Sequence, residues 1–204
     1  ETFLREWTSL VESKSGERGI FNRTSAKEQA KKFGRRDANY EFGTNPCSEI
    51  ILRPYQFCNL TEVVIREKDK FEDLKRKVML ATILGTAQAT LTKFPYLRKV
   101  WKNNTEEERL LGVSLTGIMD NELTSGKKNG LDKTLTALRE IAVETNKEWS
   151  AIFGIPQSTA ITCVKPSGTV SQLVDSSSGI HPRHSSYYIR TVRGDNKDPL
   201  TNFM

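Results

Sequence analysis

Hydrophobic residues recur at helical spacing along much of the chain, and this pattern predicts amphipathic helices. Apolar side chains placed three and four positions apart gather on one face of a helix. We expect such helices over residues 3–13, 25–34, 69–94 and 131–153. In the third of these, Asp69 with Glu72 is predicted to form the N-terminal cap. The apolar stripe of that helix is expected to comprise Phe71, Leu74, Val78, Ala81, Leu84 and Leu91.

The segments between these helices carry shorter patterns. Residues 37–68 predict loop and short strand, because Pro46 and Pro54 exclude a continuous helix. Residues 160–164 predict a short strand that leads into a polar turn and a helix start. The order of helix, strand, loop and helix predicts an α/β fold with crossover units.

Three other patterns complete the expected layout. Thr105 with Glu108 fits a capping box at the start of a helix. Residues 113–119 fit either the end of a helix or a buried strand, which periodicity alone does not decide. Residues 186–192 are rich in β-forming side chains and predict a strand.

Composition narrows the class of protein. The 204 residues are 36% hydrophobic and 27% charged, which fits one globular domain or part of a larger one. The net charge of +6 comes from scattered basic residues rather than a one-sided stripe, which argues against nucleic-acid binding. With no apolar run of membrane-spanning length and no signal peptide, we expect a cytoplasmic protein that has no membrane partner.

The chain has three cysteines, too few for a disulfide framework. Zinc binding is not expected either. Cys47 and Cys58 lack the close spacing of a zinc site, and His181 and His184 follow more than a hundred residues later. We therefore expect the cysteines to be either core residues or reactive groups.

The stretch "KPSGTVS", which begins at Lys165, is one candidate site. It follows a strand-like run and opens a helix, whose unpaired first-turn amides and dipole favour an anion. Gly168 lets a phosphate approach the backbone, and the hydroxyls of Ser167, Thr169 and Ser171 add donors. The P-loop pattern is absent. The alternative is an ordinary helix start after a turn, where Ser and Thr are common.

The stretch "NPCSEI", which begins at Asn45, is the second candidate. A thiol flanked two residues away on either side suits an extended or a tight loop. In extended backbone, residues two apart project to one side, so Asn45, Cys47 and Glu49 would face one substrate. Glu49 is suited to accept a proton from a hydroxyl that Asn45 orients. A nucleophilic thiol at Cys47 would need a histidine base, whereas a thiol that transfers a hydrogen atom needs none. The alternative is a buried cysteine in a turn, with Glu49 in a salt bridge.

These motifs together resemble the catalytic subunits of ribonucleotide reductases. "NPCSEI" followed by "FCNL" is similar to the finger loop of that family, and "GERGIFNR", "KNNTEEERLLGVSLTGI", "KPSGTVSQL" and "GIHPRH" match further segments in the family's order. The similarity runs from about residue 3 to about residue 195. The spacing of Cys47 and Cys58, "LRPYQFCNL" and "GIHPRH" most resemble the class II, adenosylcobalamin-dependent enzymes, and among them the monomeric triphosphate reductases.

The resemblance implies a role for each matching residue. Cys47 would carry the thiyl radical that abstracts the 3'-hydrogen of the ribose, and Glu49 would be the base on the 3'-hydroxyl. Asn45 would hydrogen-bond to the sugar, and Cys58 would be one of two reducing thiols. The substrate phosphate would be bound by the loop of Pro166, Ser167, Gly168, Thr169 and Val170. Cys163 matches no reacting cysteine of the family and is expected to pack.

The resemblance also implies an architecture. The family fold is a ten-stranded α/β barrel of two five-stranded halves, with the finger loop at its centre. Residues 1–36 would be a helical lead-in, residues 37–68 the finger-loop region, and residues 69–204 an incomplete second half-barrel. Tyr187 and Tyr188 are then expected on a barrel strand, while His181 and His184 are expected to shape a loop.

The expected partners follow from the same resemblance. They are adenosylcobalamin, a ribonucleoside di- or triphosphate, an external dithiol such as thioredoxin, and a complementary N-terminal reductase segment without which the chain is inactive. That segment would also supply the thiol that pairs with Cys58, because no cysteine precedes Cys47. Two alternatives remain open: a class I catalytic subunit with a separate radical-generating metal subunit, and an inactive nucleotide-binding remnant.

Overall fold

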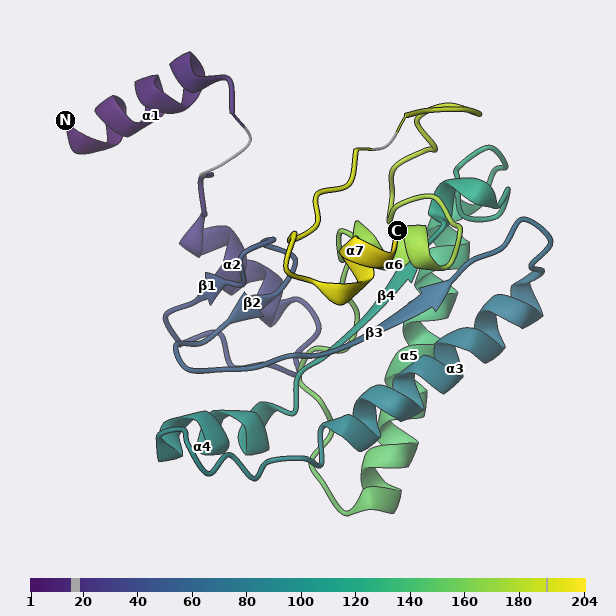
Figure 1. Cartoon of the computed structure of the whole chain (residues 1–204). Helices are drawn as coiled ribbons and strands as arrows, with labels where there is room; N and C mark the ends of the chain where they lie inside the picture. The colour runs from purple at the N-terminus through teal and green to yellow at the C-terminus, as the bar shows by residue number, and fades with distance from the viewer. Residues whose placement is uncertain (16–18, 190) are drawn as a thin grey trace.

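A parallel pair of strands backed by two long helices forms the framework of the molecule (Figure 1). The computed structural model describes residues 1–15, 19–189 and 191–204. Strand β3 (Asn59–Val64) lies beside strand β4 (Leu111–Thr116), with Asn59 opposite Leu111 and Val64 opposite Thr116. On the other side of β4, a single bridge joins Val113 to Thr162. The segment around Thr162 therefore runs along the other edge of β4, although it forms no strand beyond this bridge.

The chain passes from β3 to β4 through helices α3 (Phe71–Gln88) and α4 (Lys99–Glu108), since parallel neighbours need a long crossover. Helices α3 and α5 (Leu131–Phe153) both cover the same face of the strands, as Figure 1 shows. The buried core between them consists of Val63, Ile65, Leu74, Val78, Ala81, Ala89, Leu111, Val113, Leu138, Ala142 and Ile161. This apolar layer covers one face of β4, so only the opposite face remains available for a site.

A small hairpin stands beside this framework. Strands β1 (Gly43–Thr44) and β2 (Ile51–Leu52) pair antiparallel, and the turn between them carries "NPCSEI". Helix α2 (Arg23–Lys31) packs against it through a second cluster of Ala26, Ala30, Ala38 and Phe42 with Ile51. Helix α1 (Thr2–Ser13) stands apart in Figure 1, and none of its residues, all of which are described, is buried. The short helices η1 (Ile118–Asp120), α6 (Thr169–Leu173) and α7 (Pro199–Phe203) complete the fold.

The α/β character and the long helix at 131–153 are confirmed, but the predicted helix at 69–94 is wrong in two details. Asp73, rather than Glu72, accepts the hydrogen bond from the amide at the start of α3. The helix also ends earlier, and Leu84 and Leu91 are exposed. Leu84 lies off the buried face, which continues through Thr82, Gly85 and Thr86, and Leu91 lies beyond the end of the helix.

Two further predictions from pattern are wrong, and one alternative is decided. Thr105 and Glu108 lie in the last turn of α4, so they do not begin a helix. Residues 113–119 belong to β4 and η1, which decides for a strand. Within 186–192 the described residues form no strand, and Tyr187 is almost fully exposed; Arg190 lies outside the described residues. Among the residues that the structure describes, no helix has the length and apolar character needed to cross a membrane.

A buried ion cluster connects the hairpin to the strands. The side chain of Glu108 is 1% exposed and accepts two hydrogen bonds from Arg36, from Nε at 2.9 Å and from Nη2 at 2.8 Å. Arg53 approaches the same carboxylate at 3.1 Å, and Gln56 donates to it. Arg36 also donates to the carbonyl oxygen of Ile51 in β2 at 2.7 Å. The capping-box pattern of Thr105 and Glu108 was therefore misleading, because the Glu108 carboxylate binds distant arginines and does not cap a helix.

We predict that Glu108→Gln destabilises the protein by about 3–5 kcal/mol, because two buried guanidinium groups lose their counter-charge. The matched control is Glu107→Gln. Glu107 is the adjacent residue and also pairs with Arg53, but its side chain is 55% exposed, so its loss should cost no more than about 1 kcal/mol. Urea denaturation of both variants measures the difference. Equal losses of unfolding free energy in the two variants would contradict the prediction that the buried carboxylate contributes more than the exposed one.

Candidate active site

The face of β4 that turns away from the helices gathers the candidate residues. Successive strand residues point to opposite faces, and since Leu111 and Val113 enter the core, Gly112 and Ser114 face the other way. On this side the backbone amide of Lys165 donates to Ser114 Oγ at 2.9 Å. The loop that the sequence predicted to bind phosphate therefore lies against the free face of the strands.

Gly112 makes room for two thiols. A Cβ atom at this position would lie 3.1 Å from the Sγ atoms of both Cys58 and Cys163, and 2.5 Å from Cδ2 of Leu60. The two thiols therefore flank the same point from opposite sides of β4. Burial raises the pKa of both thiols, that of Cys163 to about 12, with nearby Glu49 acting in the same direction. Both are thus held as neutral thiols at ordinary pH.

The turn between β1 and β2 presents Cys47 to solvent. The Ser48 amide donates to the Asn45 carbonyl at 3.0 Å, and Ser48 has a positive φ of 61°. The segment is therefore the tight form of the two loop forms that the sequence left open, and a shared substrate for Asn45, Cys47 and Glu49 stays a prediction. Asn45 Oδ1 accepts a hydrogen bond from the Ile50 amide at 3.1 Å, which ties the turn together. Cys47 lies at its exposed tip.

Glu49 points inward from the same turn. Its side chain is 2% exposed, and Oε1 accepts a hydrogen bond from Lys165 Nζ at 3.2 Å. Oε2 is buried and has no hydrogen-bond partner among the described residues. Burial raises the pKa of Glu49, but hydrogen bonds from Asn45, from its own backbone and from Lys165 outweigh it and hold that pKa below its usual value. The result is a buried, ionised carboxylate with one free oxygen.

The predicted phosphate loop is partly open. Ser167 is buried and its Oγ donates to Glu62 Oε2 at 2.9 Å, so this hydroxyl is engaged. Gly168, Thr169 and Val170 are exposed, and helix α6, which begins at Thr169, has no side-chain cap. Backbone amides at this turn, rather than the Ser167 hydroxyl, are therefore available to an anion.

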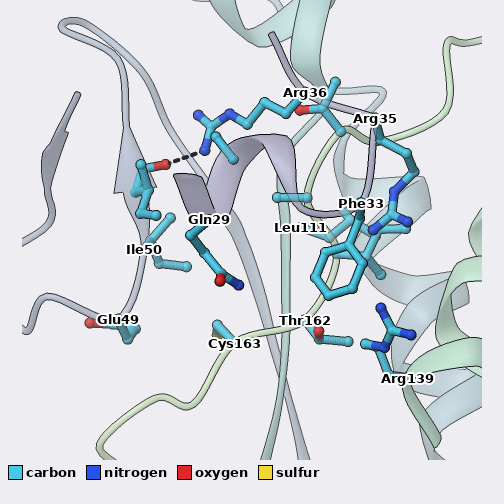
Figure 2. Close-up of a pocket in the computed structure, with 15 residues that line it drawn as sticks. Gln29, Phe33, Arg35, Arg36, Glu49, Ile50, Leu111, Arg139, Thr162 and Cys163 are labelled. Carbon is cyan, nitrogen blue, oxygen red and sulfur yellow. Dashed lines mark hydrogen bonds between the residues drawn. The ribbon is translucent and has the colours of Figure 1, made fainter. Parts of the chain in front are cut away.

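A cavity of about 180 Å³ borders these groups (Figure 2). Glu49 and Cys163 line one end, while Phe33, Arg35 and Arg139 line the other, as Figure 2 shows. Both guanidinium groups lie over the Phe33 ring, at 5.6 Å for Arg35 and 4.3 Å for Arg139. The candidate base thus opens onto a space with positive charge at its far end. The described residues form no cluster of three or more His, Cys, Asp or Glu suited to a metal ion.

Sequence reasoning missed the contributions of Lys165, Glu62 and Gly112. Alternation along β3 was the available signal for Glu62, since it follows Cys58 at a spacing of four and shares its face. No local pattern signals Lys165 or Gly112, because their partners lie on other segments of the chain. The loop-shaping role expected of His181 and His184 stays a prediction; the His181 amide donates to the Ser178 carbonyl at 2.8 Å.

We predict that thiol-specific alkylation near pH 8 modifies Cys47 first. Cys47 is exposed, whereas the buried Cys58 and Cys163 contain little thiolate because their pKa values are raised, and they should react at least about 100-fold more slowly. Mass spectrometry of peptides over time measures the three rates. In urea the rates should converge, and persistence of the difference there would exclude burial as its cause.

We predict that Gly112→Ala costs about 1–3 kcal/mol of stability, because the new methyl group would press on Leu60 and both thiols. Gly43→Ala serves as the control, since a Cβ there meets nothing within 4 Å. Urea denaturation gives the cost, and faster alkylation of Cys58 in Gly112→Ala would report the displaced thiol. Equal stability of both variants would contradict the crowding.

Comparisons with known proteins agree with the motifs, although no protein-family model matches the chain. The adenosylcobalamin-dependent ribonucleoside-triphosphate reductase of Lactobacillus delbrueckii subsp. bulgaricus is 30% identical, over 91% of this chain and 29% of the relative. That of Lactobacillus gasseri is 32% identical, over 91% of this chain and 28% of the relative. This chain therefore spans less than a third of the length of these relatives.

A solved structure leads to the same group of proteins. The crystal structure of a B12-dependent, class II ribonucleotide reductase superposes with a TM-score of 0.56 and 26% identity, over 68% of this chain and 22% of that one. The class I alternative is not favoured by any of these similarities. In sequence and in fold, this chain is related to one segment of the class II, adenosylcobalamin-dependent ribonucleotide reductases.

Proposed function

We propose that this chain provides the finger loop and substrate face of a ribonucleotide reductase, which converts ribonucleoside triphosphates to 2'-deoxyribonucleotides for DNA synthesis. The observation that carries the proposal is the pairing of an exposed thiol with a buried, half-satisfied carboxylate on one short turn. Cys47 and Glu49 are two residues apart, yet one faces solvent and the other faces the thiols across β4. A passive binding module has no need of that arrangement.

Cys47 is proposed as the radical-bearing residue. Its thiol stands at the tip of the turn between the exposed Pro46 and Ser48, so a bulky cofactor has free access, and in this respect the site fits adenosylcobalamin. When bound, that cofactor would supply the organic radical that takes the hydrogen atom from the thiol. The Cys47 thiyl radical would then take the 3'-hydrogen of the ribose. A histidine base is unnecessary for this step, because a hydrogen atom moves rather than a proton.

Glu49 is proposed as the base on the ribose 3'-hydroxyl. Its free Oε2 is an acceptor that lacks a donor in the described residues, and a substrate hydroxyl would supply one. Asn45 lies beside Glu49, where it helps to hold the pKa of that carboxyl below its usual value, and it would also orient the sugar. The lowered pKa of Glu49 keeps its carboxylate ionised and ready to accept the proton.

Cys58 is proposed as one of the two reducing thiols. Replacement of the ribose 2'-hydroxyl by hydrogen releases water and consumes two electrons and two protons, which two thiols provide when they join in a disulfide. Cys58 faces the same side of the strands as Glu49 and is stored as the neutral thiol. Its partner is proposed to come from a reductase segment outside this chain, and an external dithiol such as thioredoxin would reduce the disulfide again.

The substrate phosphates are proposed to lie at residues 166–170. The amides at the exposed turn of Gly168 and Thr169 are suited to anions. In the complete enzyme, residues 37–68 would form the finger-loop region and residues 69–204 part of the second half of a ten-stranded α/β barrel. The parallel pair of β3 and β4, with the Val113–Thr162 bridge, is consistent with three neighbouring strands of that half. We place the enzyme in the cytoplasm.

We predict that Cys47→Ala abolishes ribonucleotide reduction. The assay follows deoxyribonucleotide formation with adenosylcobalamin and dithiothreitol, using the chain alone and mixed with the segments of the Lactobacillus delbrueckii reductase that it does not match. Cys163→Ser, which alters a thiol to which we assign no role, is the matched control and should remain active. Activity in Cys47→Ala would overturn the proposal, and activity that needs no cobalamin but a separate metal protein would indicate class I chemistry.

A further inference from the structure

Lys165 reaches Glu49 from a segment more than a hundred residues away in the chain. Its Nζ donates to Glu49 Oε1 at 3.2 Å, in contact with a carboxylate that is 2% exposed, while Lys165 itself is 31% exposed. This pair joins the turn that carries Cys47 to the strand-to-loop junction that carries the proposed phosphate site. It is therefore the point at which the two candidate motifs meet.

The backbone of Lys165 has a contact at its amide and another at its carbonyl group. Its amide donates to Ser114 Oγ at 2.9 Å. Its carbonyl oxygen lies against Gly179, where an added Cβ would approach to 3.2 Å and where φ is +53°, a conformation that favours glycine. The main chain from which the Lys165 side chain extends is therefore held in place. Its ammonium group contacts Glu49, whereas most surface lysines extend into solvent.

The contact with Lys165 makes the two carboxylate oxygens of Glu49 unequal. Lys165 occupies Oε1, while Oε2 remains buried without a partner in the described part of the chain. The other groups around this carboxylate are the Asn45 amide and the thiols of Cys58 and Cys163. The thiols are neutral, so Lys165 is the one cation that the described residues place in hydrogen-bond contact with Glu49. An adjacent cation favours the charged form of a buried acid.

We propose that Lys165 is the positioning residue for the base of this site: it turns Glu49 so that Oε2 faces the substrate hydroxyl, and it keeps the carboxylate ionised. The inference deepens the proposed function and rests on it for the identity of the substrate. A different role, direct binding of substrate phosphate, would make Lys165 part of the neighbouring loop instead. The two roles differ in what they do to Glu49 in the absence of any ligand.

A titration of Glu49 tests the inference without substrate or cofactor. Carboxyl ¹³C NMR of the chain should show the pKa of Glu49 moving upward in Lys165→Met and in Lys165→Gln, because the charged form loses its cation, and returning toward the parent value in Lys165→Arg. Lys75→Met, which removes an exposed lysine of α3, should leave it unchanged. An unchanged pKa in both Lys165→Met and Lys165→Gln would overturn the inference.

Kinetics in the complemented enzyme supply the second readout. Activity requires ionised Glu49, so it is lost as pH falls through the pKa of that group, and a raised pKa moves the acid limb of the kcat profile to higher pH. We expect Lys165→Met to lower kcat by about 10- to 100-fold with little change in KM, and Lys165→Arg to restore part of it. A raised KM with unchanged kcat and unchanged acid limb would assign Lys165 to phosphate binding. If no variant or parent reduces nucleotides, the proposed function fails while the titration still decides the role of Lys165.

Discussion

The buried carboxylate of Glu108 is the interaction on which the geometry of the site depends. Glu108 ends α4 two residues before β4 begins, and Arg36 bridges it to the carbonyl of Ile51 in the hairpin. The hairpin strands are only two residues long, and they have too few hydrogen bonds of their own to hold the turn in place. Removing these charges from water is costly, and the paired hydrogen bonds between Arg36 and Glu108 offset that cost. The position of Glu49 over the strands therefore follows from an ion pair that contains no reacting group.

Strand β4 divides the molecule into two chemically different sides. Leu111 and Val113 complete an apolar layer with α3 and α5, while Gly112 and Ser114 face the thiols and the phosphate-loop segment. Because strand side chains alternate, a residue inserted into β4 would exchange these sides and destroy both the core and the site. Gly112 is suited to this position because its side chain is a single hydrogen atom, which leaves room for Cys58, Cys163 and Leu60.

The sequence was sufficient to predict the long helices and to select the candidate residues, whereas it did not predict the orientation of those residues. Periodicity predicted residues 131–153 correctly, because that helix packs along most of its length. It failed at Glu108, where a pattern typical of a helix start belongs to a helix end, since the carboxylate is engaged by distant arginines. The sequence left open whether the segment around Cys47 is an extended or a tight loop, and the positive φ at Ser48 decides for the tight loop, with Glu49 directed inward. Lys165 was overlooked for a related reason: its partner is fixed by tertiary structure.

The central position of β4 also bears on the order in which the chain acquires its chemistry. Glu49 and Lys165 are 116 positions apart, and Glu62 and Ser167 are 105 apart, with the whole of β4 and α5 between the members of each pair. Each contact closes a long loop, and the entropy of that closure must be met before the contact stabilises the fold. Before these contacts form, Cys47, Glu49 and Cys58 are separate side chains on a peptide. The site therefore exists only in the folded chain, so an incompletely folded molecule has no assembled site in which a radical could be sustained.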